Sequence, residues 1–288
     1  MALVLLDTET GEIDDKEIYS YITTKQHEAQ LKYAGIKSRN SKFEQYGTFF
    51  WLVYTPYKEL YANLDDADIT RLILLSTYLN YENVLCFDNG IPIKKSYLNR
   101  VLKMSNTSVK TFVKNMINQN ILVLEDDCIK FNNKNIYRGK LKIDSETDTE
   151  TLRIYIETVR SLYYNSTKGE RKKLCYLFKM IPWINRKYNI ICNNIFETDI
   201  DKINPLSLGE FCDIIGYDRT NVTRLKKDLL SFRYENKRLI CFMVCDDMIK
   251  STIYVSPHLY YSGSNNEIIK MIDNHFKKQE ELEATMQE

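Results

Sequence analysis

Two stretches of this sequence place basic, amide and hydroxyl side chains between apolar residues that follow helical spacing. Residues 106–118 are predicted to form a helix with a buried apolar stripe at Val109, Phe112, Val113, Met116 and Ile117. Residues 218–231 are predicted to form another, with Val222, Leu225 and Leu229 pointing inward. Both helices therefore leave a polar, mainly basic face toward solvent.

These outward faces have the residue types that bind nucleic acid. Lys and Arg neutralise phosphates, and Asn and Arg pair with adenine and guanine in the major groove. Between Lys94 and Asn118 the sequence has six basic residues and no acidic one. The candidate DNA-binding residues near the first helix are Lys94, Lys95, Arg100, Asn106, Thr107, Ser108, Lys110, Thr111 and Lys114. Those near the second helix are Arg219, Thr220, Asn221, Thr223, Arg224 and Lys227.

A similar series of elements is predicted around each polar helix. Ser96 is expected to cap a helix that buries Leu98, Val101 and Leu102, and Ser105 or Asn106 to cap the helix after it. Strands at 121–125 and 128–131 follow, around the acidic tip Asp126-Asp127.

In the second series Ser207 caps a helix that Gly216 ends, Asp218 or Thr220 caps the next, and strands at 239–244 and 250–255 follow. Each series closes on an aromatic residue, then a small or basic residue, then Gly139 or Gly263. A helix-turn-helix followed by a hairpin is the outline of a winged helix.

The expected fold class is α+β, mostly α, with two winged helix-turn-helix domains. A strand at 48–55 and a helix capped by the run Asp65-Asp66-Ala67-Asp68 precede the first polar helix. An amphipathic helix at 147–165 is expected to connect the two domains, and residues 23–46 to form a linker or basic arm with Lys25, Lys32, Lys37, Arg39 and Lys42. The expected segments are an N-terminal hairpin and arm at 1–47, winged helices at 48–143 and 167–264, a connector at 144–166, and a C-terminal helix and tail at 265–288.

The sequence shows no catalytic constellation. Its three histidines, His27, His258 and His275, lie apart from one another and from any candidate nucleophile. The seven cysteines are scattered, without a CxxC pair, which favours buried free thiols over a zinc site. Phosphate-binding glycine loops are absent. We therefore expect no enzymatic activity, no metal and no cofactor.

The formal net charge of +1 means that DNA binding must depend on local patches. A basic helix face is often only a solvated face, and the acidic tips Asp126-Asp127 and Asp246-Asp247 would repel phosphate. One domain, or the whole chain, could instead grip a host protein. Asp7 interrupts the apolar run Met1–Leu6, which is too short for the hydrophobic region of a signal peptide. No apolar run is long enough for a membrane helix, so a cytoplasmic location is expected.

The region from Phe49 to Gly139 resembles the small replication proteins of Gram-positive plasmids and their phage relatives. The resemblance rests on the aromatic strand Phe49–Tyr54, the capped helix Asp65–Leu79, the turn Tyr81–Val84 and the closing segment Phe131–Gly139. Asn133 stands where that family usually has Pro, whereas the second series has Pro257 but lacks the Arg. The layout of the whole chain also resembles larger plasmid initiators with tandem winged helices.

This resemblance implies sequence-specific binding to double-stranded DNA, as a replication initiator or transcriptional regulator of a plasmid or phage. Host replication or transcription proteins are the further partners it implies. A homodimer is left open, and the sequence does not determine the DNA target.

Overall fold

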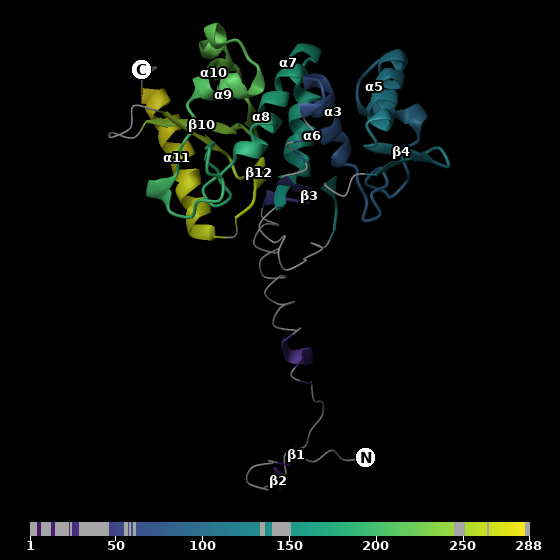
Figure 1. The fold of residues 1–288 in the computed structure, drawn as a ribbon, viewed down its shortest axis with the longest axis horizontal. Coiled ribbons are helices and arrows are strands. Elements are labelled where there is room, and N and C mark those ends of the chain that lie inside the picture. The colour runs from purple at the N-terminus through teal and green to yellow at the C-terminus, as the bar shows by residue number, and fades with distance from the viewer. Residues whose placement is uncertain are drawn as a thin grey trace. The chain divides into compact units, whose positions relative to one another are not determined.

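The computed structural model describes residues 5–6, 13–14, 23, 25–28, 46–54, 57, 59, 62–132, 136–139, 151–244, 251–263 and 265–285 (Figure 1). Contacts divide the chain into two compact units, Met1–Gln45 and Tyr46–Glu288. In the first unit β1 (Leu5–Leu6) and β2 (Ile13–Asp14) pair antiparallel, which confirms the expected N-terminal hairpin. Of the expected basic arm, Lys25 lies in a helical turn at 25–28, while Lys32, Lys37, Arg39 and Lys42 lie outside the described residues.

The second unit is built around a four-stranded antiparallel sheet. Its strands are β3 (Phe49–Val53), β6 (Ile136–Tyr137), β7 (Thr151–Tyr155) and β12 (Tyr260–Tyr261), in the order β12-β7-β3-β6. The unit combines helices with small antiparallel sheets, so the predicted α+β class is confirmed.

The register of this sheet has an approximate two-fold symmetry. At its centre Trp51 of β3 lies opposite Arg153 of β7. On the outer side of β3, Trp51 pairs with Tyr137, and on the outer side of β7, Arg153 pairs with Tyr261. A two-fold axis between Trp51 and Arg153 therefore exchanges β3 with β7 and β6 with β12.

Hydrogen bonds at the sheet edges follow the same symmetry. The Trp51 indole Nε1 donates to the Gly139 carbonyl at 2.9 Å. The Arg153 Nη2 donates to the carbonyls of Ser262, at 3.1 Å, and Gly263. The repeated closing segments thus end in equivalent edge strands, each held by the central residue of its neighbour.

Each edge strand ends a half of the unit, and the two halves have the same order of elements. The first half is residues 46–139 and the second is residues 151–263. In the first, helix α3 (Asp66–Ser76) precedes a short bridged segment at Val84, then η2 (Lys95–Tyr97), α4 (Leu98–Val101), α5 (Asn106–Asn118) and the hairpin β4 (Leu122–Glu125)–β5 (Cys128–Phe131).

In the second half three helices take the place of α3: α6 (Ile156–Asn165), α7 (Lys168–Lys173) and α8 (Cys175–Lys179), followed by η3 (Ile181–Trp183). A bridged segment at Ile190 and η4 (Ile200–Lys202) precede α9 (Leu208–Ile215), η5 (Arg219–Asn221) and α10 (Val222–Ser231). The hairpins β8 (Arg233–Tyr234)–β9 (Lys237–Arg238) and β10 (Ile240–Val244)–β11 (Ser251–Val255) complete the half. Helix α11 (Asn266–Thr285) follows β12 and takes up most of the expected C-terminal helix and tail at 265–288.

Several local predictions are confirmed by the capping geometry. The Asp65 side chain accepts from the Asp68 amide at 2.7 Å, and Ser105 caps α5. Ser207 and Glu210 form a reciprocal capping box at α9. Gly216 ends that helix in the left-handed conformation, at φ 67°, which favours glycine.

Other local predictions are wrong. Ser96 does not cap a helix, because it lies inside the 3₁₀ turn η2 and no side chain caps that turn. Ile117 is 38% exposed rather than buried, since it lies at the edge of the apolar stripe. Residues 151–155 of the expected connector helix form strand β7, because Leu152 and Ile154 pair with β3. The rest of the expected connector outside α6 and β7, at 147–150, lies outside the described residues.

The two halves share one continuous core, which runs from Phe50 to Tyr260 through both of them. The buried hydroxyl of Tyr54 in the first half donates to the Ile184 carbonyl in the second half at 3.1 Å. Lys179 of α8 reaches Asp66 at the start of α3 at 2.5 Å. Contacts within residues 46–288 therefore join the expected segments into a single compact unit.

The central Arg153 is 2% exposed, so its hydrogen bonds contribute to stability. We predict that Arg153→Met lowers the free energy of unfolding by about 3–6 kcal/mol, since each of its two hydrogen bonds involves a charged group and is worth about 1.5–3 kcal/mol. Urea unfolding measures this loss. Arg100→Met, at an exposed position, is the matched control and should change stability by less than about 0.5 kcal/mol. Equal effects of the two variants would contradict the structural role of Arg153.

His258 generates a prediction about pH. Its ring packs edge-on against Tyr46 at 4.6 Å between centroids, and burial, with repulsion from Lys237, lowers its pKa from 6.5 to about 4, against an opposing effect of Glu235. The unfolded chain therefore binds a proton at this residue before the folded chain does, so its contribution to stability is present above pH 6.5 and is lost as pH falls toward 4. Urea unfolding at pH 7.5 and at pH 5 measures how much stability the protein loses between these two pH values. This loss should be smaller for His258→Gln than for the native protein. An identical pH dependence would contradict this.

Candidate nucleic-acid interface

Helix α5 presents the first polar surface. Its helical conformation follows from the Ser105 cap and from an apolar stripe whose members Val109, Phe112, Val113 and Met116 are buried. The remaining positions face solvent, because the stripe packs against the core. All the candidate residues near this helix are exposed: Lys94, Lys95, Arg100, Asn106, Thr107, Ser108, Lys110, Thr111 and Lys114.

The cations of this surface differ in their surroundings. Lys94 lies 4.0 Å from Asp127 at the tip of the β4–β5 hairpin. The fold therefore places a carboxylate beside residues 94–118, which contain no acidic residue. Arg100 lies over the Tyr97 ring at 5.7 Å. Lys110 and Lys114, by contrast, form no ion pair within the described part of the chain. These two lysines are therefore the cations on α5 available to bind an anion.

The second polar surface is divided between η5 and α10, whereas the sequence predicted one helix over 218–231. Asp218 caps η5 through the Thr220 amide at 2.9 Å and also accepts from Asn221 at 3.2 Å. The candidate residues here are again all exposed: Arg219, Thr220, Asn221, Thr223, Arg224 and Lys227.

Arg219 is already occupied by contacts within the protein. Its Nε lies 3.0 Å from the Asp213 carboxylate and donates to the Gly209 carbonyl at 3.2 Å, both on α9. Arg219 thus joins η5 to α9. Arg224 and Lys227 on α10 make no ion pair with the residues that the structure describes, so they are the better candidates to bind a ligand.

A groove between α10 and the β8–β9 hairpin adds residues that the sequence did not reveal. It encloses about 400 Å³ and is lined by Thr223, Lys226, Lys227, Leu230, Ser231 and Arg238. Arg238 was missed because this hairpin has only two residues in each strand. The signal that could have located it is the dipeptide Glu235-Asn236, whose left-handed φ values of 50° and 65° form a tight turn.

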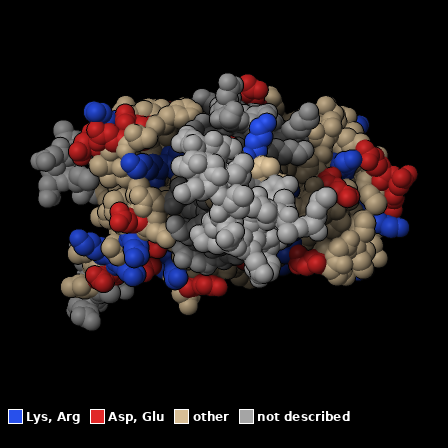
Figure 2. Space-filling view, turned by 90° about the horizontal axis from the view of Figure 1, so that it is seen from below, with Lys and Arg blue, Asp and Glu red and all other residues tan. Residues whose placement is uncertain are grey.

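Charges of both signs are distributed over another face of the molecule. Seen from below the view of Figure 1, Lys and Arg alternate with Asp and Glu in small clusters among the described residues (Figure 2). This mixed surface agrees with the net charge of +1. The basic surfaces of α5 and α10 are therefore local features.

Among residues that the structure describes, no group of three His, Cys, Asp or Glu could hold a metal ion. The described cysteines form no disulfide with one another, and burial raises the pKa of Cys192 to about 12 and that of Cys175 still higher, which keeps these thiols protonated. Cys245 lies outside the described residues. No described helix is long and apolar enough to cross a membrane.

Comparison with known proteins does not identify a family for this chain. No protein-family model, curated protein or solved structure matches it. The function must therefore be argued from the geometry of the chain itself.

Proposed function

We propose that residues 46–288 form two winged-helix modules that bind one duplex DNA in a sequence-specific manner. In this proposal the protein is a replication initiator or transcriptional regulator of a phage or plasmid, with α5 and α10 as its recognition helices. The observation that carries the proposal is the repeated order of elements, in which an exposed polar helix and a hairpin precede the edge strand each time.

The topology of each half supports the winged-helix interpretation. A winged helix has a first helix, a short strand, two helices that form a helix-turn-helix, and a two-stranded hairpin that pairs with the short strand. In the first half Val84 bridges to Lys130 of β5, and in the second Ile190 bridges to Tyr254 of β11. The short strand thus pairs with the last hairpin strand in both halves.

The recognition helices have the size and side chains that a major groove accepts. Helix α5 has 13 residues, which at about 1.5 Å per residue gives roughly 20 Å. The N-terminal residues of a recognition helix contact base edges. In α5 these include Asn106, suited to adenine, and in α10 they include Arg224, suited to guanine.

The symmetry of the central sheet supports contact of both helices with the same duplex. The two-fold axis exchanges β3 with β7, and α5 and α10 stand at the same place in the order of elements of the two halves. Figure 1 shows both helices on the side away from β3, at opposite ends of the unit. This arrangement fits a target with two half-sites in opposite orientation. The half-sites would differ in sequence, because the outward faces of the two helices differ.

The hairpin tip of the first half does not suit phosphate binding. Glu125, Asp126 and Asp127 are exposed there, and their charge would repel DNA. The helices rather than this tip would therefore supply the affinity. Asp246 and Asp247, the other acidic tip, lie outside the described residues.

A second candidate function is binding of a host protein by the first half. Tyr81 and Ile91 are 78% and 58% exposed, which is a high exposure for large apolar side chains. Together with the acidic tip at Asp126, they favour a protein partner for this face. Such a partner would be compatible with DNA on α5.

The proposal predicts that Lys110→Glu/Lys114→Glu lowers the affinity for the preferred duplex by more than about 100-fold at 0.15 M salt, because two phosphate contacts become repulsive. Fluorescence anisotropy on fragments of the genome that encodes the protein, against random duplex, measures this. Lys270→Glu/Lys277→Glu on α11 is the matched control.

Three outcomes separate the candidate functions. Loss of duplex affinity in the α5 variant, but not in the control variant, supports DNA binding. If the native protein does not bind any fragment of the genome more tightly than random duplex, the specific-binding proposal is wrong. A host protein that is retained equally by the native protein and the α5 variant, without DNA binding, favours the second candidate.

The two modules should contribute unequally. Arg224→Glu/Lys227→Glu on α10 is expected to weaken binding less than the α5 variant, because Asp218 and Asp228 already reduce the positive charge around α10. The same anisotropy assay compares them. A larger loss from the α10 variant would assign the main DNA contact to the second half.

A further inference from the structure

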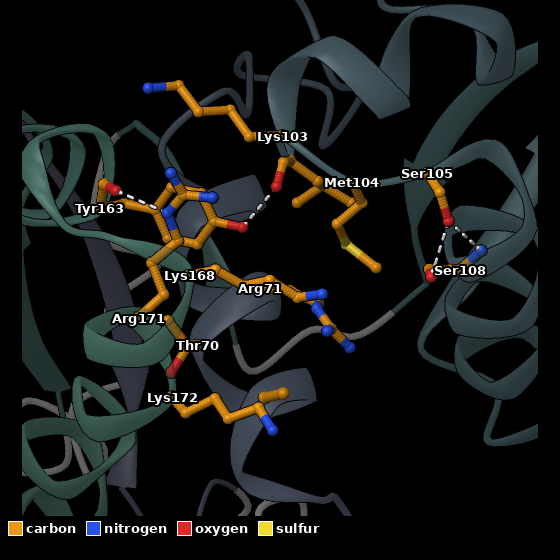
Figure 3. A pocket seen from close by; sticks show the side chains of 12 residues that line it. Thr70, Arg71, Lys103, Met104, Ser105, Ser108, Tyr163, Lys168, Arg171 and Lys172 are labelled. Atoms are coloured by element: carbon orange, nitrogen blue, oxygen red, sulfur yellow. Dashed lines mark hydrogen bonds between the residues drawn. The ribbon is translucent and has the colours of Figure 1, made fainter.

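A cleft between the two halves is lined by five basic residues. They are Arg71 of α3, Lys103 in the turn before α5, and Lys168, Arg171 and Lys172 of α7 (Figure 3). The cleft encloses about 180 Å³ and is bordered on the α5 side by Ser105 and Ser108. Residues far apart in sequence thus create a positive concavity that neither half has alone.

Two of the cations are held by neutral groups rather than by carboxylates. The Arg171 Nε donates to the Tyr163 carbonyl at 3.0 Å, and its guanidinium lies 4.9 Å from the centre of the Tyr163 ring. The Lys103 Nζ donates to the Tyr164 carbonyl at 3.1 Å, and Figure 3 shows its ammonium turned away from the cleft. Arg171 is therefore fixed in place while its positive charge remains uncompensated.

The carboxylates nearby are bound to other groups. Asp68 is the exception, because it is buried and pairs with Arg71 of the cleft at 2.5 Å, which leaves the charges of α7 to act on a ligand. Glu170 accepts from the Thr167 amide at 2.7 Å. Asp228 binds Lys173 at 2.6 Å. Lys168 and Lys172 are exposed and have no ion pair in the described ranges. No carboxylate is among the described residues that line the cleft, so its field is positive.

The size of the cleft limits its ligand. Sites for drug-sized molecules occupy roughly 300–1,000 Å³, so a cleft of about 180 Å³ suits one phosphate group better than a nucleotide. The start of α5 adds to this preference, because helix N-termini attract anions and its first turn has no acidic residue.

We propose that this cleft binds a backbone phosphodiester of the duplex, between the half-sites of α5 and α10. This inference rests on the proposed function and adds a contact at the centre of the footprint. Helix α7 lies between α5 and α10 in Figure 1, on the side away from β3. A duplex that spans the two recognition helices would therefore pass over the cleft.

The test is Lys168→Ala/Lys172→Ala in the full chain, with Lys270→Ala/Lys277→Ala as the control of equal charge. Each lysine that contacts a phosphate makes the slope of log affinity against log salt concentration steeper by about 0.9. At 0.15 M salt this corresponds to roughly a fivefold gain in affinity for each lysine. The cleft variant should lose roughly 30-fold on the preferred duplex and on random duplex alike, because phosphate contacts do not read sequence. The control should stay within about twofold of the native protein.

Duplexes with one uncharged methylphosphonate locate the contact. A position between the half-sites should weaken binding of the native protein and have no further effect on the cleft variant. Unchanged affinity and salt slope in the cleft variant, alongside loss in Lys110→Glu/Lys114→Glu, would overturn the cleft contact and leave the proposed function standing.

Inorganic phosphate distinguishes a free anion from DNA. If millimolar phosphate raises the Tm of the native protein but not of the cleft variant, and duplex affinity is the same in both, the site is for a small anion and the phosphodiester contact is wrong. If the native protein does not prefer any duplex, the proposed function fails and the cleft contact with it.

Discussion

The pairing of β3 with β7 is the interaction on which the rest of the structure depends. It places Trp51 opposite Arg153 at the centre of a sheet whose four strands come from both halves. A buried guanidinium is costly unless its donors are hydrogen-bonded, and here the carbonyls of Ser262 and Gly263 accept from the Nη2 of Arg153. Since these carbonyls follow the last strand of the second half, that half must be complete before the arginine is paired.

The same pairing determines how the two polar helices are presented. Because β3 and β7 are antiparallel about a local two-fold axis, the helix-rich parts that follow them extend to opposite ends of the unit. The shared core and the Lys179–Asp66 ion pair hold these parts in a fixed relation. A rigid spacing between α5 and α10 would favour a duplex with half-sites at one fixed separation, and it creates the cleft at α7 between them.

Features that depend on neighbouring residues could be predicted from the sequence. The caps Asp65, Ser105 and Ser207, the end of α9 at Gly216, and the stripe of α5 were predicted because each involves residues a few positions apart. The exposure of the candidate DNA-binding residues follows from the same periodicity.

Features that depend on distant partners could not be predicted. Leu152 and Ile156 have helical spacing, and only the pairing with β3 makes residues 151–155 a strand. The contact of Lys94 with Asp127 arises when the hairpin folds back. The cleft brings together Arg71 and Lys172 from different halves, so no local pattern indicates it.

The central claim is that one chain holds one duplex through two unlike helices. Hydroxyl-radical footprinting on the preferred duplex, with stoichiometry from sedimentation equilibrium, tests it most directly. We expect one chain per site and two protected patches of different sequence, with protection of the backbone between them. A single patch, or two chains on each site, would contradict the claim.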